Sequence, residues 1–185
     1  GMKLKVTGKV EDDMERLNLK FKEKLEKLFK LYEITGGYPA SINKDPTVEE
    51  QVIAAFESEI LKNKYSLAWT KEILASIIRK APSPISFLTV GKDVGISYKT
   101  VQEYVEMLSN IFVLGIAPYK ADRPMWRKEK KIFIQDPFIA WTLSEWTGEK
   151  FLESALYEWI VQAHLKRKTG EVYYYRGRYE VDCIA

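Results

Sequence analysis

The stretch that says most about the fold runs from Ser86 to Asn110 and reads SFLTVGKDVGISYKTVQEYVEMLSN. It contains two patterns of helical length, residues 86–94 and 97–110. Between them lies Gly95, which gives the backbone the freedom that a tight turn needs. The stretch therefore predicts two helices joined by a short turn.

Each predicted helix has a capping residue and an apolar face. Ser86 and Ser97 can accept hydrogen bonds from the first free backbone amides of the helices that follow them. The apolar positions recur at helical spacing. In the second helix they are Val101, Tyr104, Val105 and Leu108, and in the first they are Leu88, Val90 and Val94. We expect both faces to be buried.

The flanking segments extend this pair of helices into a larger unit. An amphipathic helix precedes it and stops ahead of Pro82 and Pro84; its apolar residues are Trp69, Ile73, Leu74, Ile77 and Ile78. Two apolar runs follow, 111–119 and 131–135, with a basic loop at 120–131 between them. Three helices followed by two strands are the order of a winged helix.

The outward positions of this unit provide candidate nucleic-acid contacts, because cations neutralise phosphates and amides can read base edges. The candidates are Lys99 and Gln102 on the second helix, and Arg123, Arg127, Lys128 and Lys130 on the basic loop. Lys120 and Lys131 add charge to that loop, and Trp126 is available for stacking or packing. Glu103 and Glu106 on the helix would repel phosphates. DNA binding and packing against a protein both stay open.

Composition sets outer bounds. A chain of 185 residues, 46% hydrophobic and 13% aromatic, can bury a real core. Its net charge of +3 comes from 29 basic and 26 acidic residues, too small an excess to demand an anionic partner. Cys183 is the only cysteine, which excludes an internal disulfide and favours a reducing compartment. No apolar run approaches the roughly 20 residues of a membrane span. We expect a cytoplasmic protein that does not associate with membranes.

The first 64 residues read as a helical segment. One long helix ends at Thr35, Gly36 and Gly37; its apolar residues are Met14, Leu17, Leu19, Phe21, Leu25, Leu28, Phe29, Leu31 and Tyr32. A second helix begins at Asp45 or Thr47; its expected buried stripe is Val48, Val52, Ile53, Phe56, Ile60 and Leu61. Packing is the expected role of both.

The last segment, residues 137–185, predicts a helix and a β-hairpin. The helix opens at Gly148 and Glu149 and ends in the basic run 166–168; its apolar residues are Phe151, Leu152, Ala155, Leu156, Trp159, Ile160 and Ala163. Two strands follow, 172–175 and 179–185. With the winged helix at 65–136, the chain is expected to be a mainly helical α+β protein.

Three carboxylates of this segment are candidate catalytic residues. Strand alternation places Glu180 and Asp182 on one side of the hairpin. Together with Glu153 they could converge on a divalent cation such as Mg²⁺, with Glu153 and Asp182 as the candidate metal ligands. The alternative is that they are solvated charges of a helix and of an edge strand. His164 has no second histidine or nearby cysteine and is expected to be structural.

Residues spread along the chain carry a resemblance to a known family. They are Tyr32, Gly36, Gly37, Tyr38, Pro39, Gly95, Ile96, Ser97, Tyr98, Tyr104, Lys131, Ile132, Phe133, Asp136, Pro137, Gly148, Leu152, Glu153, Tyr173, Tyr174, Tyr175, Arg176, Glu180, Val181 and Asp182. In order and spacing they resemble the C-terminal region of prokaryotic AAA-type ATPases of the archaeal ATPase group. In that region a winged helix is followed by a segment similar to PD-(D/E)xK nucleases.

The resemblance implies nuclease-type roles for Glu153 and Asp182, but the later acid-x-Lys strand would lie beyond Ala185. We therefore expect the chain to be part of a longer protein. It has no Gly-x-x-x-x-Gly-Lys-Ser/Thr loop, so we expect no ATP hydrolysis by this chain. ATP and Mg²⁺ would be cofactors only of an upstream ATPase domain.

Three hypotheses follow. The preferred one is a noncatalytic module of an AAA-type ATPase that binds DNA or a protein partner through the winged helix. The second is a fragment of a metal-dependent nuclease. The third is a structural or regulatory domain that packs against an ATPase domain or other subunits and binds no nucleic acid.

Overall fold

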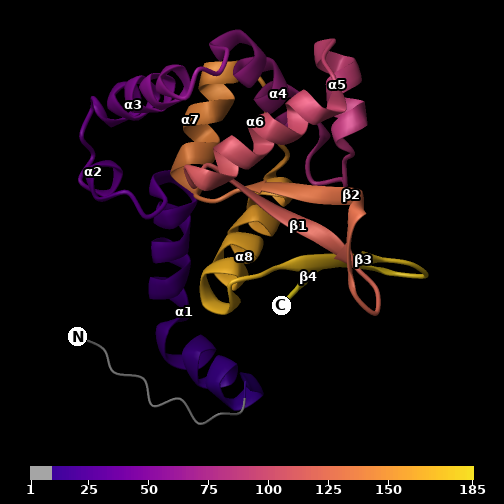
Figure 1. Ribbon diagram of the computed structural model, residues 1–185. Coiled ribbons are helices and arrows are strands. Elements are labelled where there is room, and N and C mark those ends of the chain that lie inside the picture. The colour runs from indigo at the N-terminus through magenta and orange to yellow at the C-terminus, as the bar shows by residue number, and fades with distance from the viewer. Residues whose placement is uncertain (1–9) are drawn as a thin grey trace.

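The computed structural model describes the backbone from residue 10 to 185 and the side chains from residue 21 onward. Over this part the protein has eight helices and a four-stranded mixed sheet (Figure 1). The helices are α1 (Val10–Thr35), α2 (Pro39–Ile42), α3 (Val48–Lys62), α4 (Leu67–Lys80), α5 (Phe87–Val94), α6 (Tyr98–Asn110), α7 (Pro137–Thr147) and α8 (Glu153–Thr169). The strands are β1 (Leu114–Lys120), β2 (Pro124–Ile134), β3 (Tyr173–Arg176) and β4 (Glu180–Ile184). The expected mainly helical α+β class is confirmed.

The sheet joins the central and C-terminal segments. Its strand order is β2-β1-β3-β4. The β1–β2 and β3–β4 pairs are antiparallel, whereas β1 and β3 run parallel and meet at Tyr119 and Tyr174. Helix α6 packs on β1, and α8 packs on β2 and β4 (Figure 1). The sheet thus spans the expected boundary between residues 136 and 137.

The two helices predicted around Gly95 are confirmed. Ser86 caps α5, because its hydroxyl accepts from the amide of Thr89 at 3.0 Å. Ser97 caps α6 in the same way, accepting from the amide of Thr100 at 3.1 Å. Gly95 adopts the left-handed conformation with φ of 76° that ends a helix without the strain of a side chain.

The inward face of α6 is buried as predicted; it consists of Val101, Tyr104, Val105 and Leu108. In α4 the same holds for Ile73, Leu74, Ile77 and Ile78. Two predicted core positions are wrong. Trp69 and Leu88 are 43% and 55% exposed. Trp69 lies at the margin of the core with its ring 6.2 Å from that of Tyr104, and Leu88 lines a surface groove next to α6. The phenol oxygen of Tyr104 accepts from the amide of Ser66, which connects α6 to the cap of α4.

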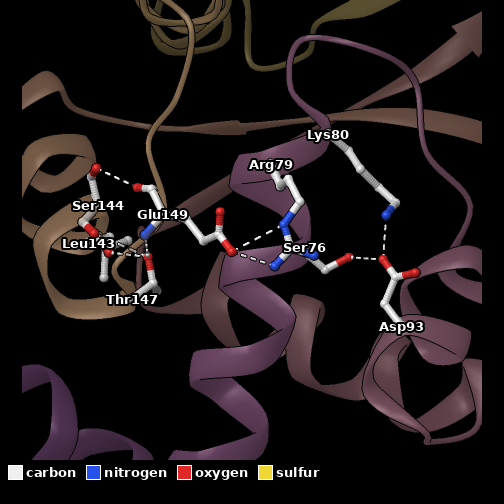
Figure 2. A network of polar contacts seen from close by, with 8 residues as sticks. All are labelled: Ser76, Arg79, Lys80, Asp93, Leu143, Ser144, Thr147 and Glu149. Atoms are coloured by element: carbon white, nitrogen blue, oxygen red, sulfur yellow. Dashed lines mark hydrogen bonds and ion pairs between the residues drawn. The ribbon is translucent and has the colours of Figure 1, made fainter.

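Polar contacts fix α4 against its neighbours (Figure 2). Asp93 of α5 accepts hydrogen bonds from Lys80 and from the hydroxyl of Ser76, and these bonds lower the pKa of Asp93. Arg79, the residue before Lys80, donates to Glu149 in the segment between α7 and α8. The winged-helix candidate is thereby connected to the C-terminal segment through α4 as well as through the sheet.

The prediction of a basic loop at 120–131 is wrong, because most of these residues belong to β2. Only residues 121–123 separate β1 from β2. The register pairs Pro118 with Lys130 but Tyr119 with Met125, so residues 126–129 bulge out of the β1–β2 ladder. Pro118 has no amide hydrogen to donate to that ladder, which favours a bulge at this point.

A further backbone pairing lies on the other edge of β2. The amide of Ile85 donates to the carbonyl of Lys130 at 2.8 Å, and the amide of Lys130 donates to the carbonyl of Ile85 at 2.9 Å. Because Ile85 stands one residue before the cap of α5, this bridge fixes the start of α5 beside β2.

The N-terminal helices pack only in part. Val48, Phe56 and Ile60 of α3 are buried as predicted, whereas Leu61 is 57% exposed. The predicted packing of α1 is wrong for four residues that are between 40% and 51% exposed: Leu25, Leu28, Phe29 and Leu31. The reason is that α1 contacts α7 mainly through its C-terminal end. The predicted positions Met14, Leu17 and Leu19 lie outside the described side chains.

Asp136 connects the end of α1 to the start of α7. One carboxylate oxygen accepts from the amide of Gly37 at 2.9 Å, and the other accepts from the amide of Phe138, which caps α7. Gly36 has φ of 53°, and a Cβ atom there would lie 1.8 Å from the Asp136 carboxylate. The glycine pair after α1 therefore has a structural role, since it lets the turn approach Asp136 closely.

The C-terminal helix begins later than predicted. Gly148 ends α7 in the left-handed conformation with φ of 76°, and α8 starts only at Glu153. A glycine after an apolar helix is a stop signal, so the prediction that Gly148 opens a helix is wrong: Gly148 ends α7, which the sequence pattern does not predict. The basic run 166–168 does lie in the last turn of α8, and the predicted hairpin is confirmed as β3 and β4.

No helix in the described part of the chain has both the length and the apolar character to cross a bilayer.

Candidate nucleic-acid interface

A groove of about 680 Å³ lies between α6 and the bulge of β2. We call it the α6–β2 groove. The side chains used below come from α6 on one side and from β2 on the other; they are Tyr98, Gln102, Glu106, Trp126, Arg127, Lys128 and Lys130. The start of α5 and Ile116 of β1 complete the lining. The Ile85 bridge fixes the start of α5 beside β2, and both border this groove.

The structure brings four of the predicted contact residues into this groove: Gln102, Arg127, Lys128 and Lys130. Two others are not part of it. Lys99 is exposed on α6 and Arg123 is exposed in the turn before β2, and neither lines the groove. The predicted site is thus concentrated on the β2 bulge more than on the helix.

Two cations of β2 lie over aromatic rings. The ammonium of Lys130 lies 4.6 Å from the ring centre of Phe87 and donates to the carbonyl of Lys128 at 3.0 Å. Burial lowers the pKa of Lys130. The ammonium of Lys128 lies 4.8 Å from the ring centre of Tyr119. A cation over an aromatic face keeps its charge available to an anion on the open side. The third cation, Arg127, is exposed to solvent.

The outer face of α6 is less suited to DNA. The amide of Gln102 donates to the carboxylate of Glu106 at 2.7 Å, so the group expected to read base edges already has a partner. Glu103 and Glu106 are both exposed on this face, with Lys99 as the nearby cation. Carboxylates in contact with a duplex would repel its phosphates.

The prediction that Lys131 adds charge to a basic loop is wrong, because Lys131 is buried in β2. Adjacent residues of a strand point to opposite faces, so Lys130 faces α5 while Lys131 faces α8. The Lys131 side chain is only 4% exposed. Its ammonium lies 3.0 Å from Glu158 and 3.2 Å from Glu180, and it also donates to Asp182. We call these four residues the Lys131 cluster.

The Lys131 cluster borders a second cavity of about 540 Å³. Burial opposes the charge of Lys131, but its hydrogen bonds to Asp182 and Glu158 outweigh that effect and raise the pKa of Lys131. Burial also raises the pKa of Glu158. The sequence pattern pointed to Glu180 and Asp182 but missed Glu158 and Lys131, although strand alternation would have separated Lys131 from Lys130.

The candidate metal ligands do not share a site. Glu153 lies outside the Lys131 cluster and accepts a hydrogen bond from the phenol of Tyr157 at 2.6 Å. Asp182 is paired with Lys131, so an ammonium already occupies the position where a cation would balance its charge. The described residues contain no group of three or more His, Cys, Asp or Glu side chains placed to hold a metal ion. The arrangement does not fit the Mg²⁺ site that the pattern suggested.

The single histidine is packed against an aromatic ring. The His164 ring centre lies 5.6 Å from that of Tyr32, which joins α8 to α1. Burial and the neighbouring charge of Arg167 lower the pKa of His164. The ring contact supports a structural role for His164, although the residue is exposed.

Comparisons with known proteins give one match. Residues 26–150 match a family described as a domain of unknown function (DUF8612). No curated protein and no solved structure matches the chain. The matched residues run from within α1 to the segment after α7, so they include the whole of the α6–β2 groove and exclude α8 and the C-terminal hairpin. Since the match covers more than half of the sequence, the chain belongs to the DUF8612 family.

Proposed function

We propose that this chain is a noncatalytic module that binds DNA through the α6–β2 groove. The observation that carries the proposal is the concentration of Arg127, Lys128 and Lys130 beside the exposed ring of Trp126 in one groove. Clustered cations attract the phosphate backbone. The one carboxylate that lines the groove, Glu106, accepts a hydrogen bond from Gln102.

The arrangement of elements supports a winged-helix interpretation of this module. Helices α4, α5 and α6 are followed by the antiparallel pair β1 and β2, and Ile85 pairs with β2 just before α5 begins. Winged helices bind DNA or proteins, so the element order alone does not choose between these partners. The charge of the β2 bulge favours DNA, and the residues that resemble the C-terminal region of AAA-type ATPases favour a place within such a protein.

The test is the affinity for a fluorescently labelled DNA that contains both a duplex and a single-stranded tail. We expect the double variant Arg127→Ala, Lys128→Ala to bind roughly tenfold or more weakly, because each cation that meets a phosphate releases a counterion. Fluorescence anisotropy measures the change.

The matched control is the double variant Lys24→Ala, Lys27→Ala, which removes the same charge from the exposed surface of α1. It should bind like the unmodified protein. Equal losses in the two variants would mean that net charge acts without a defined site, and the groove would no longer be supported.

A nuclease remains the second candidate, favoured by the cavity beside Glu180 and Asp182. Because the ammonium of Lys131 lies between these carboxylates, where a metal ion would have to bind, we expect no cleavage of plasmid DNA in the presence of Mg²⁺ or Mn²⁺. Agarose electrophoresis compares the protein with an Asp182→Ala variant. Cleavage by the unmodified protein that disappears in this variant would contradict the noncatalytic proposal.

A further inference from the structure

We infer that the α6–β2 groove holds a single strand of nucleic acid, with a base stacked on Trp126, in preference to an intact duplex. This inference rests on the proposed function and narrows it to one class of ligand. Three features carry it: the position of Trp126, a second pocket that extends the groove, and the charge of the α6 surface.

Trp126 is exposed at a point where two hollows meet. Its side chain is 60% exposed on the bulge of β2. It lines the α6–β2 groove and also a smaller pocket of about 250 Å³ beside Lys166 and Tyr173. Ile116 likewise lines both. The two hollows therefore adjoin across Trp126 and form one elongated track.

The track carries aromatic rings and cations along its length. Tyr98, 49% exposed, lines the α6 side of the groove. The smaller pocket is lined by the half-buried Lys166 and by Tyr173. The ammonium of Lys120, outside this lining, lies 4.6 Å from the ring centre of Tyr173. Proteins that bind single strands combine aromatic platforms for bases with cations along the backbone path. The unstacked bases of a single strand can reach Trp126, whereas the bases of a duplex are stacked on one another.

The charge of α6 disfavours the usual duplex geometry. A recognition helix would place its outer face in the major groove. On α6 this face presents Glu103 and Glu106, and the amide of Gln102 is bound to Glu106. Insertion would bring two carboxylates among phosphates, which costs affinity. Of these two carboxylates, contact along the track brings only Glu106, which already accepts a hydrogen bond from Gln102, near the ligand, and leaves Glu103 outside the track.

The experiment compares three labelled ligands of about 15 nucleotides or base pairs by fluorescence anisotropy: oligothymidylate, oligouridylate and a duplex hairpin. Both single strands should bind more tightly than the hairpin, and the tighter of the two identifies DNA or RNA as the source. Trp126→Ala should weaken single-strand binding about tenfold, since stacking of one base on an aromatic ring is of that order. Trp126→Phe should keep most of the affinity.

Trp69→Ala is the matched control, because Trp69 is 43% exposed and lines neither hollow. It should leave single-strand affinity unchanged. Tighter binding of the hairpin, or single-strand binding that is unaffected by Trp126→Ala, would overturn the inference. If such binding still falls in the Arg127→Ala, Lys128→Ala variant, the proposed function survives and only the single-strand inference fails. If none of the three ligands binds, both fail.

Discussion

Replacement of Lys131 by methionine is expected to lower the free energy of unfolding by about 3 kcal/mol at neutral pH, because removing one partner of a buried ion pair leaves the other charges uncompensated. The ammonium is 4% exposed, and Glu158 is 11% exposed. Glu180 and Asp182 are 37% and 52% exposed, so water moderates their repulsion and places the effect at the lower end of the range for buried pairs. Urea denaturation measures the difference.

The pH dependence of this difference gives a second readout. Lys131 lowers the pKa of Glu158, so its loss should raise that pKa further above its present, already raised position. Protonation then relieves the repulsion among the carboxylates as the pH falls. The deficit of the Lys131→Met variant should therefore shrink from pH 7 toward pH 4. Lys128→Met, at an exposed position on the same strand, should change stability by less than about 0.5 kcal/mol. Equal losses in the two variants would contradict the structural role of the Lys131 cluster.

Replacement of Gly36 by alanine is expected to lower the free energy of unfolding by about 3 kcal/mol. The left-handed backbone conformation costs an alanine about 1 kcal/mol. The new Cβ would also lie 1.8 Å from the Asp136 carboxylate and displace it from the amides of Gly37 and Phe138. Loss of these charge-assisted bonds adds about 2 kcal/mol. Thermal and urea denaturation test the sum.

Gly148 provides the control for this substitution. It has φ of 76°, but a Cβ atom added there meets nothing within 4 Å. Gly148→Ala should therefore lose only the backbone part, about 1 kcal/mol. The prediction fails if both alanine variants lose the same stability, because the approach of Asp136 to the turn would then contribute nothing.

Local sequence signals predicted much of the fold because the forces behind them are local. Ser86, Gly95 and Ser97 marked the limits of α5 and α6, since capping and left-handed turns depend on neighbouring residues. The parallel meeting of β1 and β3 could not be predicted, because pairing across more than 50 residues depends on how α7 and α8 pack between them. The prediction for Gly148 is wrong because the sequence gives no sign of α7, the helix that Gly148 ends. The apolar residues of α7 lie nearly all around the helix and give no periodic stripe.

The candidate site, like the fold, could be predicted from the sequence only in part. Charge and residue type alone identified Arg127, Lys128 and Lys130, and the structure places them together in the α6–β2 groove. Lys131 belongs to the same basic run, but its side chain points to the other face of β2 and is neutralised there. In a strand only the charged side chains on one face can share a site, whereas the predicted loop carries no such alternation.

We propose that the cations of β2 that line the α6–β2 groove bind the phosphate backbone. The most direct test of this claim is the affinity of the unmodified protein for the tailed DNA, measured by anisotropy across a series of salt concentrations. Contacts between phosphates and Arg127, Lys128 and Lys130 predict that the logarithm of the association constant falls with the logarithm of salt concentration with a slope of about −2 to −3. An association constant that does not change with salt, or no binding at the lowest concentration, would contradict the claim.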